Sequence, residues 1–258
     1  MSRTSRLSLP PGLALLATLI VLGTVATSPA LAASGRSIGL QGIYPLNAQP
    51  YGRSWGDWTA TWWQWALSMP VSSHPLFDTA DCSAGQSGPV WFLGGAFTGI
   101  AATRSCTVPA GISLFFPLLN SECSTVEPPP FYGADEAEMR ACAAGWVDSG
   151  SDLFCIIDGV AVENVSSYRV DSPLFSFTAP NDNIFGIPGP VTGESVSDGY
   201  WIFLAPLSAG QHTIRFGGSF PGFPIDVTYE LTVRPGGRGR GQVAGDAGTW
   251  GMVKRLYR

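Results

Sequence analysis

The sequence predicts a mainly β protein: an antiparallel β-sandwich or jelly roll with one tryptophan-rich helix and one short additional helix. Short apolar runs separated by turn residues recur along most of the chain, and strand patterns do not alternate regularly with helical ones as in a doubly wound α/β fold. The composition agrees, because 32 Gly, 21 Pro, 14 Phe, 9 Trp and 7 Tyr in 258 residues favour a loop-rich β domain over a helical bundle.

The first 32 residues are typical of a cleavable secretory signal peptide. Arg3 and Arg6 form a basic start, residues 13–25 are apolar and uncharged, and Ala30 and Ala32 are small residues of the kind that a signal peptidase accepts. The apolar stretch is shorter than the ~20 residues that span a bilayer, so we expect no integral membrane segment after cleavage. The expected location is secreted or periplasmic.

The remainder divides into a folded body and a tail. Residues 33–233 are expected to form a single β-sandwich domain, whereas residues 234–258 are basic and poor in apolar residues, which predicts disorder. The body carries 6 Lys and Arg against 18 Asp and Glu, a formal net charge of −12. A surface this acidic repels phosphate backbones, so we expect no nucleic-acid partner.

A helix is expected near residues 55–68. Ser54 and Asp57 have the spacing of a helix N-cap, and Pro70 follows the end. A 3-4 spacing places four indoles and a thioether on one stripe: Trp55, Trp58, Trp62, Trp65 and Met69. Such a stripe usually faces the core, which makes Trp63, off the stripe, the better ligand contact.

The rest of the pattern is mainly β. The expected strands are residues 90–93, 112–119, 153–157, 160–163, 201–205, 211–216 and 225–233. Asp158-Gly159 predicts a tight hairpin turn, and the last strand alternates apolar and polar residues, as in an antiparallel sheet with one wet face. A second helix is expected from Asp135 to Ala144 with Gly145 as its stop, and residues 179–199 are expected to be irregular.

The five cysteines predict two disulfides in an exported protein. Fifteen arrangements leave one cysteine free, and the pairs Cys82–Cys106 and Cys123–Cys142 are preferred because each closes a loop of about twenty residues. Cys155 lies in an apolar run and is expected to be a buried free thiol.

Candidate catalytic residues lie in expected loops and at strand ends. They are His74, Asp78, Asp81, Glu122 and Glu127. A histidine and two carboxyls could supply acid and base for glycan cleavage, although acids in loops commonly cap helices, make turns or face solvent. Ser54 lies in a Gly-x-Ser-x-Gly pattern, but no strand precedes it as a hydrolase elbow requires.

Candidate ligand-binding residues are Trp63, Arg104 and Asn120. No cofactor is expected, apart from a possible Ca²⁺ at Asp182, Glu194 and Asp198, where turn chemistry is the simpler interpretation. Only two histidines, His74 and His212, are present, which excludes three-histidine zinc sites.

Three functions remain open. The first is an exported binding or interaction module for a glycan or other neutral polar ligand. The second is a secreted glycan-acting hydrolase or lyase, and the third is a structural envelope protein without a ligand. Side chains converging in one cleft favour the second, an open aromatic groove favours the first, and scatter over several faces favours the third.

Overall fold

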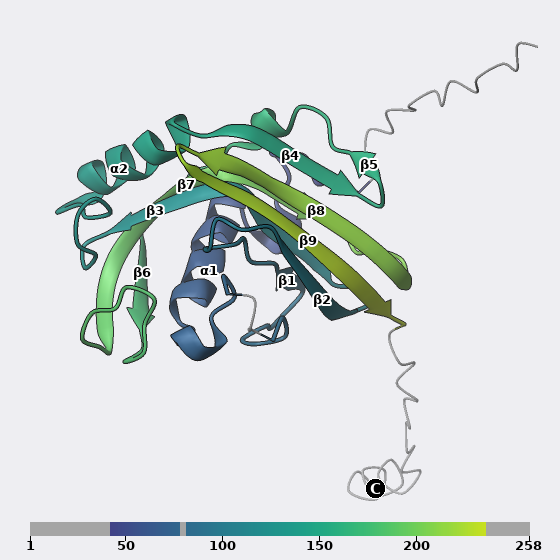
Figure 1. Cartoon of the computed structure of the whole chain (residues 1–258), viewed down its shortest axis with the longest axis horizontal. Helices are drawn as coiled ribbons and strands as arrows, with labels where there is room; N and C mark the ends of the chain where they lie inside the picture. Colours follow the sequence, from purple (N-terminus) through teal and green to yellow (C-terminus); the bar gives the residue numbers. More distant parts are fainter. Residues whose placement is uncertain (1–41, 78–80, 236–258) are drawn as a thin grey trace, which may run out of the picture. The chain divides into compact units, whose positions relative to one another are not determined.

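The protein is a two-sheet β-sandwich with two helices, as the sequence predicts (Figure 1). The computed structural model describes residues 42–77 and 81–235. The expected signal peptide, Asp78 and the expected tail beyond Pro235 lie outside the described residues, while Arg234, the first tail residue, ends the last strand. No helix among the described residues is long and apolar enough to cross a membrane.

Sheet A has four strands. In spatial order they are β1 (Val90–Phe92), β3 (Ser113–Ser124), β7 (Val191–Leu204) and β6 (Phe175–Ala179). The central pair β3–β7 and the pair β6–β7 are antiparallel, as expected. The short edge strand β1 runs parallel to β3, which makes the sheet mixed.

Sheet B has five strands. In spatial order they are β2 (Ala102–Pro109), β9 (Phe223–Arg234), β8 (Gly210–Phe220), β4 (Ser151–Ile157) and β5 (Val160–Ala161). The hairpin predicted at Asp158-Gly159 joins β4 to β5. The edge strand β2 is parallel to β9. Three short 3₁₀ helices complete the secondary structure: Pro50–Gly52, Val71–Ser73 and Val165–Tyr168.

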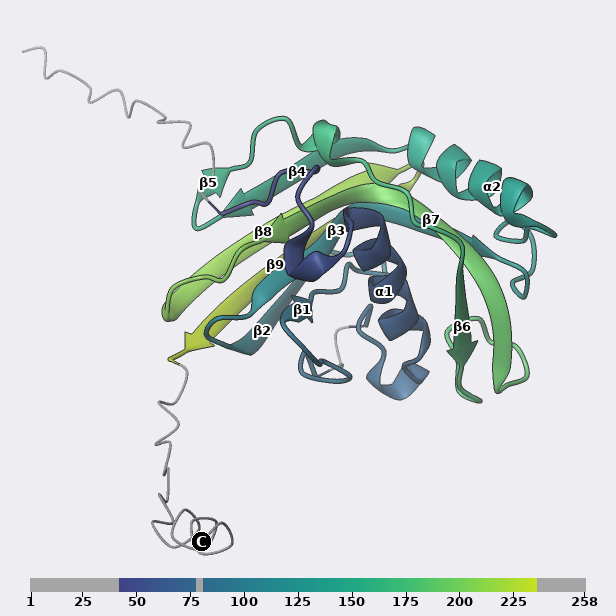
Figure 2. The same ribbon diagram turned by 180° about the vertical axis from the view of Figure 1, so that it is seen from behind.

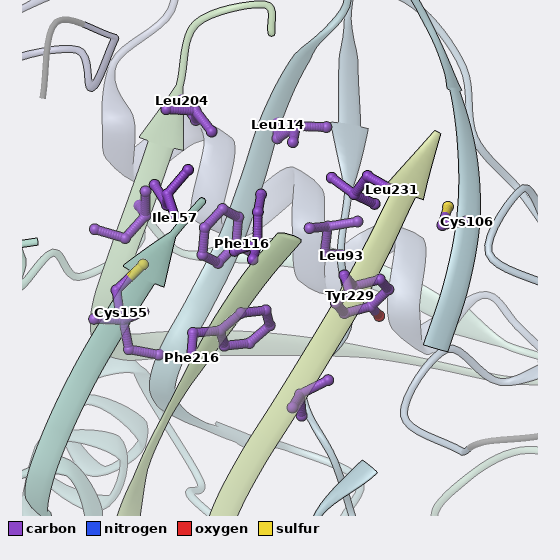
Figure 3. Packing of buried hydrophobic residues seen from close by; sticks show 14 of the residues in the cluster. Leu93, Cys106, Leu114, Phe116, Cys155, Ile157, Leu204, Phe216, Tyr229 and Leu231 are labelled. Carbon is purple, nitrogen blue, oxygen red and sulfur yellow. The ribbon is translucent and has the colours of Figure 1, made fainter. Parts of the chain in front are cut away.

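The main core lies between the sheets. Phe116 and Ile202 of sheet A and Phe216 and Leu231 of sheet B are fully buried there. Figure 3 shows side chains of both sheets meeting in this layer, and the rings of Phe116 and Phe216 lie 4.7 Å apart. Cys155 is a buried free thiol in the same cluster, as predicted.

Helix α1 (Trp55–Leu67) covers the face of sheet A that points away from sheet B (Figures 1 and 2). Ser54 and Asp57 form the predicted capping box. The predicted indole stripe faces inward: Trp62 is wholly buried and donates from Nε1 to the carbonyl of Leu93 at 3.0 Å. Burial of aromatic area against sheet A therefore holds this helix in place.

Helix α2 (Glu136–Asp148) packs on the other face of sheet A, against β3 and β7. It extends past Gly145, where the sequence predicts a stop. Val147 is buried, and the ring of Trp146 stacks on Phe131 at 5.1 Å. Packing of this last turn outweighs the lower helix propensity of glycine, which costs about 1 kcal/mol relative to alanine.

The prediction that residues 179–199 are irregular was wrong from residue 191 onward. Residues 191–199 form the first part of β7, because this stretch pairs with β6 on one side and β3 on the other. The strands β2 and β6 were not predicted, since both are edge strands rich in polar residues.

Candidate functional site

His74 is a buried, neutral histidine. Its side chain is 1% exposed, and Nδ1 accepts from the backbone N–H of Leu76 at 3.3 Å. Desolvation lowers its pKa to about 4, against a weaker opposing contribution from the backbone of Ala66. No hydrogen-bond partner for Nε2 is present in the described part of the chain. His74 is therefore uncharged at neutral pH.

Arg104 is a buried connector between three segments. Its Nη1 donates to the carbonyls of Pro75, Gly94 and Gly95 and to the hydroxyl of Tyr229, at distances from 2.9 to 3.1 Å. Tyr229 in turn donates to the Gly94 carbonyl at 3.0 Å. These contacts fix the loop after β1 and the loop after α1 against sheet B, so Arg104 has a positioning role.

A pocket of about 160 Å³ lies beside this connector, at the β2 edge of sheet B. We call it the β2-edge pocket. It brings together two predicted residues, Asp81 and Arg104, with four aromatic side chains. Its lining comprises Trp65, Pro75, Phe77, Asp81, Cys82, Phe92, Gly94, Thr103, Arg104, Ser105 and Tyr229.

The wall of the β2-edge pocket is fixed by a disulfide and a capped turn. Cys82 is bonded to Cys106, and Cys123 to Cys142, which confirms both predicted pairs. Asp81 is exposed and accepts from the backbone N–H and the hydroxyl of Ser83, each at 2.9 Å. These hydrogen bonds lower the pKa of Asp81, so it remains a carboxylate at neutral pH.

Glu122 and Glu127 form a second cluster, a hydrogen-bonded carboxyl pair. Ser195 donates to Glu122, and Ser124 donates to Glu127 at 2.9 Å. Desolvation raises the pKa of both groups, and the neighbouring Glu122 helps to raise that of Glu127 to about 11. Glu127 is therefore protonated at neutral pH.

This geometry does not match a glycosidase. Retaining and inverting enzymes hold their two carboxyls about 5–10 Å apart, with sugar or water between them, whereas Glu122 and Glu127 bond to each other directly. Within the described residues, His74 shares neither a hydrogen bond nor a pocket with this pair. Among the described candidates, the Glu122–Glu127 pair therefore lies apart from His74 and from Asp81.

The other two predicted ligand contacts lie away from the β2-edge pocket. Trp63 is only 9% exposed and contacts the ring of Trp62, so its place off the stripe did not leave it at the surface. Asn120 lies on β3, opposite Gly199 of β7. The indole Nε1 of Trp63 and the Nδ2 of Asn120 are buried, and no described group accepts from either.

The suggested calcium residues do not converge. Asp198 is bound to Arg169, whose Nη2 lies 2.6 Å from Oδ2, while Glu194 lies exposed on β7. Across residues 42–77 and 81–235, no group of three His, Cys, Asp or Glu side chains could hold a metal ion. Asp182 contributes its backbone carbonyl to Val71, in a loop contact.

Sequence reasoning missed Tyr229 and Ser105 as pocket residues. The alternation of β9 predicts that Tyr229 points inward, but nothing in the sequence places its hydroxyl beside Arg104. Ser105 lies on β2, a strand that the sequence did not predict. His212 of β8 has a side chain that is 11% exposed, and its Nδ1 lies 2.7 Å from Asp158 Oδ2.

Comparisons with known proteins assign no family. No family model matches the chain, and no curated protein matches it. Among solved structures, a cysteine protease inhibitor from Entamoeba histolytica aligns with 15% identity, covering 56% of this chain and 96% of that chain. Its TM-score of 0.21 is too low to support an argument about fold or function.

Proposed function

We propose that the protein is an exported binding module that takes a glycan or another neutral polar ligand into the β2-edge pocket. The observation that carries this proposal is the lining itself. Aromatic side chains of Trp65, Phe77 and Phe92 lie beside polar groups of Asp81 and Ser105. Apolar walls with a few placed polar groups are typical of small-ligand sites.

The dimensions of the β2-edge pocket support binding of part of a larger ligand. A volume of about 160 Å³ is below the ~300 Å³ at which drug-sized sites begin, so the pocket holds one end or one unit of a ligand while the rest stays outside. Phe97 and Ile100, both exposed, lie in the loop before β2. The ring of Phe97 is 6.0 Å from that of Phe77 in the pocket wall.

Charge and disulfides support the ligand class and the location. A body with a formal net charge of −12 disfavours anionic ligands, and only neutral polar or cationic ones avoid that repulsion. Two disulfides form and persist in oxidising compartments, which agrees with export. A mass spectrum of the secreted protein beginning near residue 33 would support export, and one beginning before residue 30 would contradict it.

The enzyme alternative is not proposed, because the Glu122–Glu127 pair does not share a centre with His74. The β2-edge pocket contains Asp81 as its one described carboxylate, whereas acid–base glycan cleavage uses two.

The test is a polysaccharide array followed by calorimetry with a matched pair of variants. Ser105 and Thr107 are both exposed on the same face of β2, and only Ser105 lines the pocket. Ser105→Trp should abolish binding of the retained glycan, and Thr107→Trp should leave it unchanged. Absence of any retained glycan, or equal behaviour of the two variants, would refute the proposal.

A further inference from the structure

A second and larger cavity lies between α2 and β7, two elements that Figure 2 shows next to each other. We call it the α2 cleft. Its volume is about 370 Å³, which is within the range of small-molecule sites, about 300–1,000 Å³. Its lining comprises Arg140, Ala143, Ala144, Arg169, Asp171, Val196, Ser197 and Asp198. None of these residues belongs to the β2-edge pocket.

Charges of both signs line the α2 cleft, and they cancel. Arg140 Nη1 lies 3.0 Å from Asp171 Oδ2, and Arg169 Nη2 lies 2.6 Å from Asp198 Oδ2. Two guanidiniums and two carboxylates thus give a lining with no net charge but with separated positive and negative groups. The carboxylates repel a simple anion and the guanidiniums repel a simple cation, so the lining favours neither kind of ion.

Contacts outside the α2 cleft hold both guanidiniums in place. Glu136 accepts from Nε and Nη2 of Arg140 at 2.9 and 2.7 Å, and Asp148 accepts from Nη1 of Arg169 at 2.7 Å. Because these partners approach from α2, the arginines keep their orientation without a ligand. Such preorganisation lowers the entropy cost of binding.

The α2 side of the α2 cleft is small and apolar. Ala143 and Ala144 are consecutive on the helix, and Val196 faces them from β7. Alanines leave room that longer side chains would fill. The remaining space therefore suits a ligand with a small apolar group beside its charged groups.

We propose that the α2 cleft binds a small zwitterion of the free α-amino-acid type. The ligand ammonium contacts Asp171 and Asp198, and its carboxylate contacts Arg140 and Arg169. The site is independent of the glycan site, because it lies on α2 and β7 rather than at the β2 edge.

Calorimetry with a free amino acid and its two blocked forms tests the charge requirement. L-alanine, L-serine and dialanine are titrated at up to about 10 mM, a concentration that detects millimolar binding. For the tightest of them, the N-acetylated form and the C-terminal amide should each bind at least about tenfold more weakly. Absence of heat from all three zwitterions, or equal affinity of a blocked form, would overturn the proposal.

A pair of helix variants tests the location. Ala144→Leu fills the α2 cleft without changing its charge, and should abolish binding. Ala141→Leu makes the same change on the exposed side of α2 and should leave affinity unchanged. Both variants are checked for the wild-type melting temperature. Loss of binding in neither variant, or in both when both are folded, would place the ligand elsewhere.

Discussion

Sheet A carries a helix on each face, and the two helices are attached by different physical means. Helix α1 buries nine of its thirteen residues, and five of those nine are tryptophans. Helix α2 is equally long but buries three: Met139, Ala143 and Val147. Burial of aromatic side chains holds the first helix, whereas the Cys123–Cys142 disulfide and the ion pair of Arg140 with Asp171 tie the second to other segments.

The comparison shows how a helix that buries little apolar area can stay packed on a sheet. Most helical stability in proteins comes from packing of an apolar face, and α2 has a small one. A covalent link to β3 and charge contacts to the neighbouring segment supply the rest. The small number of buried apolar residues on α2 also leaves the α2 cleft open beside this helix.

The largest expected loss of stability follows from a change on the face of sheet A that α1 covers. Trp62 is completely buried and contacts the rings of Trp63, Trp65 and Trp201. Trp62→Ala should destabilise the protein by about 3–5 kcal/mol through lost burial and a cavity. Trp146→Ala, the matched change on α2, should cost less than half as much, because that indole is half-buried. Urea unfolding measures both, and equal losses would contradict the comparison.

The next effect is on the α2 face. Replacing Cys123 and Cys142 together by alanine opens a loop of 19 residues and should cost about 3 kcal/mol. Hydrogen exchange should accelerate throughout α2 and stay slow in α1. Near-ultraviolet circular dichroism, dominated by the α1 tryptophans, is the control. A change in that signal comparable to the change in α2 exchange would show that the two faces are not independent.

A third prediction concerns pH and the carboxyl pair formed by Glu122 of β3 and Glu127 of the loop after β3. Because the pKa of Glu127 is raised from 4.5 to about 11, the folded state holds more protons than the unfolded chain between these values. The pair's contribution to stability is therefore full below about pH 4.5 and is lost as pH rises toward 11. Glu127→Gln, which imitates the protonated group, should flatten this decline in melting temperature. An unchanged slope would contradict the assignment.

His74, in the loop after α1, should change stability with pH in the opposite direction. Its folded-state pKa of about 4 lies below the ordinary 6.5, so the unfolded chain binds the proton first. Its contribution is present above pH 6.5 and is lost as pH falls toward 4. The pH profile of Glu127→Gln should retain this acid-side decline, which serves as an internal control.

The smallest expected effects are at the helix N-caps. Ser54 caps α1, and Asp135 caps α2 by accepting from the backbone N–H of Glu138 at 2.9 Å. Ser54→Ala and Asp135→Ala should each cost about 1 kcal/mol. Only Asp135→Ala should increase hydrogen exchange in the helix beyond its first turn, because α2 has less packing to hold it. An equal increase in hydrogen exchange in both helices would contradict the expected difference between α1 and α2.

The sequence predicted the periodic elements well and the edges poorly. The indole stripe with Ser54 and Pro70 gave α1 within one residue, and the alternation after Ile225 gave β9. By contrast, β2 and β6 lack a clear apolar run, and residues 191–199 carry the Gly and acidic residues of a loop. These stretches become strands because neighbouring long strands supply their backbone hydrogen bonds. The local sequence pattern contains no information about those neighbours.

The candidate sites were the least predictable part. Asp81 and Arg104 meet in one pocket, yet Glu122 and Glu127 bond to each other away from His74. The α2 cleft was not predicted at all, because Arg140, Arg169 and Asp198 are far apart in sequence and lie on different elements. Spatial convergence of loop and strand residues leaves no periodic signal in a sequence.

The sequence alone determined the fold class, the inward face of α1, the two disulfides and the acidity of the body. Each follows from a local or compositional property: period, spacing or charge count. The folding of the whole chain decided the rest: the edge strands β1 and β2 run parallel to their neighbours, two glutamates share a buried contact, and two arginines and two aspartates face one cavity. Those outcomes depend on which distant segments pack together, and packing is decided by the whole chain at once.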